Sequence, residues 1–143
     1  MSKQSKTALL TGGNGNLGQL VADRLLEARF KVVRFDLPGT EPDATRQGEE
    51  IITGDIRDVA LIEQILEQHQ PNIIYHLASL LSASSEAHLE TAWEINAGAS
   101  FQLLRLAVKH RIGSLFFAST GASYRVIVCD NASGDGSLER ISD

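Results

Sequence analysis

The glycine-rich stretch TGGNGNLG at residues 11–18, here called the glycine loop, limits what this chain can fold into more than any other feature. It follows an apolar run at residues 7–10 that predicts a short buried strand. After it, apolar residues recur at helical spacing: Leu17, Leu20, Val21, Leu25 and Ala28. A strand, a glycine turn and a helix in this order direct the free N–H groups of the first helical turn at an anion. The stretch predicts an α/β domain with a phosphate site, and a plain strand-to-helix turn is the alternative.

Each residue of the glycine loop has an expected task in binding a dinucleotide. Gly12 permits a tight turn, Gly15 lets the backbone approach a pyrophosphate without a Cβ between them, and Gly18 lets the helix pack close to the strand. Asn16 and Leu17 lie in the first helical turn, whose N–H groups face the phosphates. No Lys-Ser/Thr pair follows the glycines, which excludes the phosphate loop of nucleoside triphosphatases.

The acidic residue Asp36 ends a second predicted strand, residues 31–36. In a dinucleotide-binding domain, a carboxylate at this place accepts hydrogen bonds from both ribose hydroxyls and repels a 2′-phosphate. Asp36 therefore predicts NAD rather than NADP as the cofactor. The alternative is a strand-end acid that contacts only solvent.

Strand-like and helix-like segments alternate along the rest of the chain. Further strands are expected at residues 50–53, 73–77 and 115–118, and Asp58 is the expected N-cap of a helix that stops before Pro71. This alternation implies parallel strands joined by right-handed crossovers. We therefore expect an α/β fold, a doubly wound parallel sheet of five strands.

A long helix is expected within residues 85–110, and it is apolar on two faces. The first face comprises Ile95, Ala99, Leu103, Leu106 and Ala107, and the second comprises Phe101, Leu104 and Val108. A helix of this kind packs against the sheet and against a second body, so we expect a homodimer through residues 85–110.

Composition narrows the range of partners. With 143 residues the chain is long enough for one domain, and its net charge of −5 without a basic cluster argues against nucleic acid. The single cysteine, Cys129, suits a reducing compartment. The sequence shows no signal peptide and no apolar run of membrane-spanning length. We expect a cytoplasmic protein with no membrane contact and no metal site.

Five motifs occur in an order known from one family: TGGNGNLG, GDIRD (54–58), YHLAS (75–79), EINAGAS (94–100) and FFASTGASY (116–124). Together they resemble the extended short-chain dehydrogenases/reductases of the NAD-dependent epimerase/dehydratase family, and residues 75–96 look most like the L-threonine 3-dehydrogenase branch. The resemblance implies a Rossmann-type domain over residues 1–124, with strand order 3-2-1-4-5, that holds NAD at the carboxyl ends of its strands. Residues 125–143 are then an atypical tail.

The resemblance also implies roles for residues beyond the glycine loop. Asp55 matches the acid that contacts the adenine amino group, with Ile56 packed beside the ring, although a capping or turn role is the alternative for Asp55. Leu77, Ala78 and Ser79 match the strand end that lies along the ribose and nicotinamide of the cofactor.

Further roles concern the reaction centre. Asn96 resembles the asparagine that holds a helix kink and an ordered water, and Thr120 resembles the catalytic Ser/Thr that hydrogen-bonds the substrate oxygen. Ser82 is expected to border the substrate. By contrast, His76 is expected to be a satisfied core histidine, and Trp93 is expected to serve packing.

The chain departs from the family in what it lacks. The family uses a tyrosine as general acid/base with a lysine one helical turn later, and no Tyr-x-x-x-Lys occurs in this sequence. Residues 125–134 resemble the second strand rather than the expected continuation. A truncated or rearranged domain is one interpretation of this likeness, and chance similarity between buried strands is the other. Arg29 stands where a helix-ending glycine is usual and is expected to adopt the left-handed conformation.

The expected function is therefore stated with alternatives. The resemblance implies the NAD-binding domain of an oxidoreductase that transfers hydride to or from a carbinol carbon of a small-molecule substrate, either a sugar nucleotide or a 3-hydroxy amino acid. The alternatives are a non-catalytic NAD-binding or redox-sensing module and a truncated, inactive fragment.

Overall fold

A computed structural model describes residues 4–79, 87–118 and 126–130 of the chain. In chain order the elements are β1 (Thr7–Thr11), α1 (Asn16–Glu27), β2 (Lys31–Asp36), β3 (Glu49–Thr53), α2 (Val59–His69), β4 (Ile73–His76), α4 (Leu89–Trp93), the π-helical segment η1 (Glu94–Ala99), α5 (Ser100–Lys109), β5 (Ser114–Ala118) and β6 (Val126–Asp130). Thr120, Ser82 and Tyr124 lie outside the described residues.

The sheet has the order β3-β2-β1-β4-β5-β6, and its first five strands are parallel. The predicted α/β fold and strand order 3-2-1-4-5 are therefore confirmed. The expectation of five strands is incomplete, because β6 from the expected tail pairs antiparallel with β5, from Ala118 opposite Val126 to Ser114 opposite Asp130. An antiparallel partner needs only a short connection, so this edge strand required no further crossover helix.

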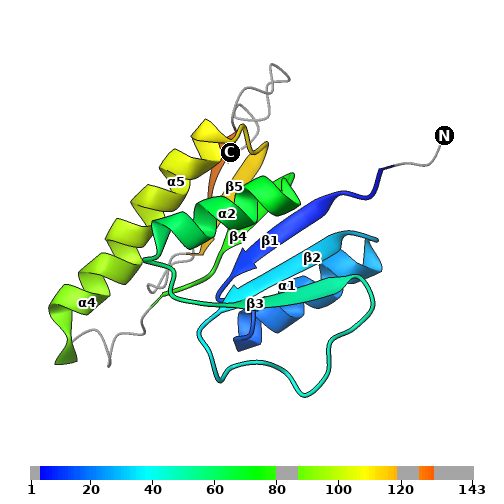
Figure 1. The fold of residues 1–143 in the computed structure, drawn as a ribbon, viewed down its shortest axis with the longest axis horizontal. Coiled ribbons are helices and arrows are strands. Elements are labelled where there is room, and N and C mark those ends of the chain that lie inside the picture. The colour runs from blue at the N-terminus through cyan, green and yellow to red at the C-terminus, as the bar shows by residue number, and fades with distance from the viewer. Residues whose placement is uncertain (1–3, 80–86, 119–125, 131–143) are drawn as a thin grey trace.

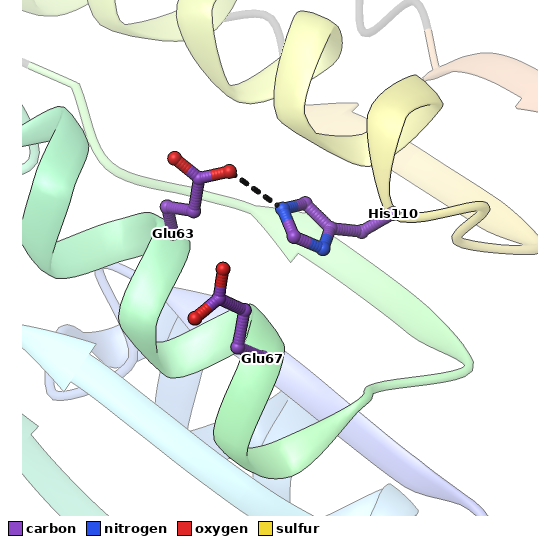
Figure 2. Close-up of side chains that lie close together, drawn as sticks. All are labelled: Glu63, Glu67 and His110. Atoms are coloured by element: carbon purple, nitrogen blue, oxygen red, sulfur yellow. Dashed lines mark hydrogen bonds and ion pairs between the residues drawn. The ribbon is translucent and has the colours of Figure 1, made fainter.

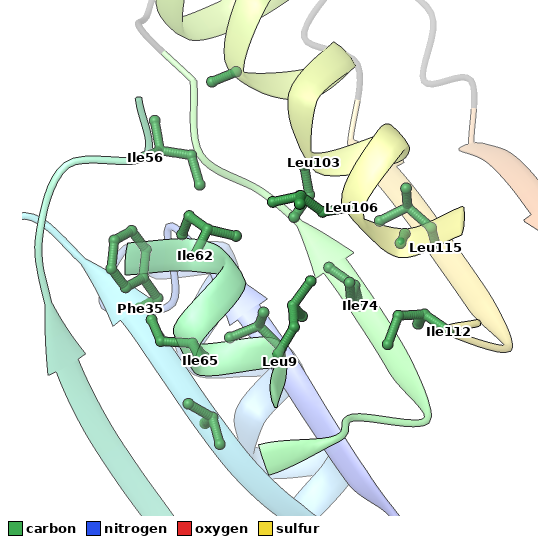
Figure 3. Close-up of a cluster of buried hydrophobic side chains, with 14 residues drawn as sticks. Leu9, Phe35, Ile56, Ile62, Ile65, Ile74, Leu103, Leu106, Ile112 and Leu115 are labelled. Carbon is green, nitrogen blue, oxygen red and sulfur yellow. The ribbon is translucent and has the colours of Figure 1, made fainter. Parts of the chain in front are cut away.

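Helices cover both faces of the sheet, with α1 on one side and α2 and α5 on the other (Figure 1). Alternate residues of β1 point to opposite faces, so Ala8 and Leu10 pack with Ala22 and Leu25 of α1. Leu9 belongs to the larger core on the other face (Figure 3). Around Leu9, that core gathers residues from three further strands, α2 and α5: Val33, Phe35, Ile62, Ile65, Leu66, Ile74, Leu103, Leu106 and Leu115.

The buried face of α1 differs from the face that its apolar residues outline. Leu17 and Leu20 are 50% and 63% exposed, whereas Gly18, Ala22 and Leu25 are buried. Small residues at the contact let α1 lie close to the sheet, and Leu17 and Leu20 lie on its open side. Helical spacing located the helix and, with Val21 and Leu25, part of its contact face, but not the contacts of Gly18 and Ala22.

Helix ends follow the predicted chemistry. The Asp58 carboxylate accepts a hydrogen bond from the Leu61 N–H at 3.1 Å, which confirms it as the N-cap of α2. Helix α2 closes at Gln70, which has φ 43° and precedes Pro71. Arg29 has φ 63° after α1, which confirms its left-handed conformation.

The long helix is interrupted by the π-helical segment η1, which contains Asn96, the residue at which the resemblance implies a helix kink. Its sheet-facing side is buried as expected at Ala99, Leu103, Leu106 and Ala107. Phe101 and Val108 of the second predicted face are exposed. Trp93 is 73% exposed, so its expected packing role is wrong for contacts within the described part of the chain.

Candidate cofactor site at the carboxyl ends of the strands

A cleft of about 280 Å³ opens beyond the carboxyl ends of β1, β2, β3 and β4. The strand order reverses between β1 and β4, which is where open α/β sheets bind ligands. Most of the predicted cofactor residues line it: Gly12, Gly15, Asp36, Asp55, Ile56, Leu77, Ala78 and Ser79. Asn16, Leu17, Gly18 and Asn96 are not among its lining residues, and the lining residues that sequence reasoning missed are Phe35, Leu37, Gly54, Arg57 and Ile95.

The glycines of the loop are required for different reasons. Gly12 has φ +66°, and a Cβ there would lie 2.8 Å from the Ala78 backbone nitrogen. A Cβ on Gly18 would lie 2.5 Å from the Gly13 carbonyl oxygen, so Gly18 makes room for the loop itself rather than for the strand. A Cβ on Gly15 would meet only the Gly12 carbonyl oxygen at 3.5 Å, and the backbone there is extended, with φ −73°. Among these three, only Gly15 is not required by the packing of the described chain.

The first turn of α1 lacks the side-chain cap that α2 has. Its N-cap residue is Gly15, no side chain of the described residues caps the free N–H groups there, and the first turn holds no acidic residue. Gly15 lines the cleft, so these N–H donors and the positive end of the helix dipole are available to an anion bound in it.

The Asp36 carboxylate is held by the backbone on both oxygens. Oδ2 accepts the Asn14 N–H at 2.9 Å, and Oδ1 accepts the Leu37 N–H at 2.8 Å. Each oxygen keeps one further acceptor position. Asn14 itself is buried and donates through Nδ2 to Thr40 Oγ1 at 3.1 Å, and its Oδ1 has no partner among the described residues. Its place between Gly13 and Gly15 was the only sequence signal that could have indicated its role.

Arg34 supports the glycine loop from behind. Its Nε donates to the Gly13 carbonyl at 2.9 Å, and its Nη1 lies 3.3 Å from Glu49 Oε2. The two side chains are 3% and 0% exposed, which makes this a buried ion pair. Burial raises the pKa of Glu49, but the hydrogen bonds and charge of Arg46 together with the charge of Arg34 outweigh it and leave that pKa below its ordinary value. The loop therefore rests on a charged network spanning β2 and β3.

His76 is buried at the centre of a chain of hydrogen bonds, which confirms the expected core histidine. The Ser100 hydroxyl donates to the Asn96 carbonyl at 2.9 Å, so it accepts from His76 Nε2 at 2.7 Å. The neutral ring then carries its proton on Nε2, and Nδ1 accepts from Thr11 Oγ1 at 2.6 Å. Burial lowers the pKa of His76 to about 4. A neutral imidazole thus joins the strand before the glycine loop to the segment that contains Asn96.

Outside the cleft, Glu63 and Glu67 of α2 face His110 at the end of α5 (Figure 2). Their ligand-type atoms all lie within 4.8 Å of one another. The Glu63 carboxylate already accepts hydrogen bonds from Lys109 Nζ at 2.5 Å and His110 Nε2 at 2.9 Å, and these two partners hold its pKa below its ordinary value. A metal ion would need the Glu63 carboxylate as a free ligand, but that carboxylate is already bonded to the ammonium of Lys109. We therefore interpret the cluster as an ion-pair link between the two helices.

Comparison with known proteins points to one family. The family model described as "NAD dependent epimerase/dehydratase family" matches residues 8–126. UDP-glucose 4-epimerase of Rhizobium leguminosarum bv. trifolii is 31% identical over 123 residues, which cover 83% of this chain and 37% of the relative. A monomeric L-threonine 3-dehydrogenase from a metagenome superposes with a TM-score of 0.68 at 30% identity, covering 76% of this chain and 34% of that protein. The Bordetella bronchiseptica enzyme WbmH in complex with NAD+ gives a TM-score of 0.68 at 24% identity, covering 78% and 38%.

The chain spans 30% to 38% of the length of the curated relatives that it matches. In the part of the chain that the structure describes, no helix combines the length and the apolar character needed to cross a membrane.

Proposed function

The chain belongs to the NAD-dependent epimerase/dehydratase family, and from this membership we propose that the cleft beyond the parallel strands binds NAD. The observation that carries the proposal is Gly15. Its φ of −73° suits any residue, and a Cβ would have room in the protein, so neither the backbone nor the packing calls for glycine. A ligand that comes within contact distance of this backbone would call for it. The uncapped first turn of α1 makes that ligand an anion, as the pyrophosphate of a dinucleotide is.

The remaining residues of the cleft fit the rest of the cofactor. Asp36 would accept hydrogen bonds from ribose hydroxyls on the acceptor positions that Asn14 and Leu37 leave open, and its charge would repel a 2′-phosphate. Asp55 and Ile56 would border the adenine. Leu77, Ala78 and Ser79 would lie along the ribose and nicotinamide.

The first test is calorimetric titration of the purified chain with NADH and, separately, with NADPH. We expect saturable binding of NADH, with a dissociation constant at least about tenfold lower than that for NADPH. The variant Asp36→Asn keeps the shape of the side chain and loses its charge, so it should narrow that preference. A folded, monodisperse chain that takes up neither dinucleotide would overturn the proposal.

The reaction we propose for the whole protein is hydride transfer at a carbinol carbon. NAD supplies the hydride acceptor in such chemistry, and Thr120 would orient the substrate hydroxyl. The relatives named above include a UDP-glucose 4-epimerase and an L-threonine 3-dehydrogenase, so a sugar nucleotide and a 3-hydroxy amino acid are the two proposed substrate classes. A binding module without turnover is the second candidate. NAD binding without NADH formation from L-threonine and without epimerisation of UDP-glucose would favour the module.

We further propose that two copies of the chain associate through the outer face of α4, η1 and α5. The large apolar side chains there are exposed: Leu89, Trp93, Phe101 and Val108. A turn of π-helix contains about one residue more than a turn of α-helix. Trp93 and Phe101, on either side of η1, therefore lie on the same face of the helix. Phe101 and Val108, which are seven residues apart, share that face in the same way. The four side chains then form one exposed apolar stripe, and a surface of this kind marks a site of protein association.

Sedimentation equilibrium would test this association. We expect a dimer for the wild-type chain and a monomer for Phe101→Glu, because a buried charge in an apolar interface is costly. Leu20→Glu is the matched control, since Leu20 is as exposed as Phe101 but lies on α1. A wild-type monomer, as described for the metagenomic L-threonine 3-dehydrogenase, would contradict the proposal.

A further inference from the structure

Arg34 and Asp36 of β2 hold the two ends of one peptide unit in the glycine loop. The Gly13 carbonyl oxygen accepts a hydrogen bond from Arg34 Nε at 2.9 Å. The N–H of the same peptide unit belongs to Asn14 and donates to Asp36 Oδ2 at 2.9 Å. Arg34 and Asp36 are two residues apart on β2, so their side chains leave the strand on the same face. The orientation of this peptide unit is therefore set from both ends by one strand.

Strand β2 also approaches the loop closely at this point. The Gly13 N–H donates to the Phe35 carbonyl oxygen at 3.2 Å. A Cβ on Gly13 would lie 2.9 Å from Arg34 Cβ and 3.0 Å from the Leu10 carbonyl oxygen. Both distances are shorter than ordinary van der Waals contacts, so any side chain here would push the loop away from β2. The second glycine of the loop is thus required where Arg34 reaches it.

Packing alone does not call for an arginine at position 34. Its side chain is 3% exposed and leaves β2 on the same face as Val32, which belongs to the apolar core against α1. Its Nη2 has no hydrogen-bond partner among the described residues, so part of the cost of burying the guanidinium is not offset. A buried ion pair, such as that with Glu49, generally stabilises a fold no more than apolar side chains of similar volume. The bond to the Gly13 carbonyl is what an apolar side chain could not supply.

We propose that Arg34 is a positioning residue that, through the peptide unit it holds, orients the Asp36 carboxylate for the ribose of the dinucleotide. This inference rests on the proposed NAD site, and Arg34 itself is not among the residues that line the cleft. Because N–H donors hold both oxygens of Asp36, its open acceptor positions point in fixed directions. Without the Nε donor the peptide unit is free to turn and the Asn14 N–H leaves Oδ2. The carboxylate then keeps only the bond from Leu37 and rotates.

The deciding experiment compares NADH with the analogue that lacks the 2′-hydroxyl of the adenosine ribose, because the two ligands carry the same charge. Calorimetry of the wild-type chain should give at least about tenfold weaker binding of the analogue, the low end for one hydrogen bond to a charged acceptor. Arg34→Lys keeps the positive charge beside Glu49 and has a methylene where Nε stands. In this variant the ratio of the two dissociation constants should fall to within about threefold of one.

Arg34→Gln is the matched control, because glutamine loses the charge and keeps an N–H donor on the atom that follows Cδ, where Nε stands. We expect Arg34→Gln to keep the wild-type ratio, although it is the less similar of the two in charge. Both variants should fold, which urea denaturation checks, since Glu49 keeps its hydrogen bonds to Arg46.

A residue that only supported the loop, or acted only by its charge, would not give this pattern. A ratio that survives in Arg34→Lys, a ratio that falls in Arg34→Gln, or a wild-type chain that binds both ligands equally would overturn the role of Arg34 and leave the NAD site standing. A wild-type chain that binds neither would overturn both proposals.

Discussion

Replacing Gly15 with valine should abolish measurable NADH binding while leaving the fold intact. The Cβ and methyl groups would occupy the space in which the pyrophosphate meets the backbone, so we expect the dissociation constant to rise at least about 100-fold, or about 2.7 kcal/mol. The backbone at Gly15 is extended, with φ −73° and ψ 174°, which a β-branched residue adopts readily. Loss of a modest N-cap preference is offset by lower entropy of the unfolded chain, so the free energy of unfolding should change by less than about 1 kcal/mol. Calorimetry and urea denaturation measure the two quantities.

Gly12→Ala is the matched contrast at the other end of the same loop. Its φ of +66° disfavours alanine, and the added Cβ would lie 2.8 Å from backbone atoms of Leu77 and Ala78. We expect a loss of at least about 2 kcal/mol in the free energy of unfolding. If instead Gly15→Val destabilised the chain as much as Gly12→Ala, Gly15 would be a structural glycine and the main support for the NAD site would be lost.

The arrangement of the sheet could be predicted because few topologies satisfy the pattern. Each apolar run is short and each intervening segment is long enough for a crossover helix, which predicts a parallel sheet with right-handed crossovers. The resemblance to the family then selects the order 3-2-1-4-5, which the sheet has. The glycine loop fixes where the first crossover begins, and Asp58 fixes where α2 begins. These are local signals, which a sequence carries directly.

Features that depend on long-range contacts were not predictable. Leu17 and Leu20 are apolar and lie on the open side of α1, because the small Gly18 and Ala22 set the distance to the sheet. The π-helical segment η1 has no composition signal of its own. The apolar run at residues 126–130 was recognised as strand-like, but its antiparallel pairing with β5 comes from the edge left open beside that strand.

The candidate site divides in the same way. The motifs predicted the residues whose backbone or position forms the cleft, such as Gly15, Asp36 and Ala78. They missed Asn14 and Arg57, whose roles come from hydrogen bonds to Asp36 and Asp55. A backbone N–H has no sequence signature, and the pairing of a guanidinium depends on which carboxylates the fold brings within reach.

His76 should make the stability of the fold depend on pH between 4 and 6.5. Burial lowers its pKa from 6.5 to about 4, so in this range the unfolded chain binds a proton that the folded chain does not. The stability that the neutral ring contributes is complete above pH 6.5 and is lost as the pH falls from there towards 4. The gap between the two pKa values is equivalent to about 3 kcal/mol. Urea denaturation at pH 7 and pH 4 measures this loss. The same measurement on the variant His76→Gln separates it from the stability changes due to carboxylates, which titrate in both proteins.

His76→Gln should be less stable than the wild type at pH 7, because its amide reproduces the hydrogen bonds to Thr11 and Ser100 only in part. At pH 4 the difference should have narrowed by about 3 kcal/mol, since only the wild type loses stability through this residue. An NMR titration of the wild-type imidazole gives a check that needs no variant. A ring that protonates near pH 6.5 in the folded chain, or equal pH slopes for the two proteins, would mean that His76 is not the neutral link between Thr11 and Ser100. The hydrogen-bond chain that connects Thr11 to Asn96 would then contain a positively charged imidazole. Among the described residues no carboxylate contacts that ring.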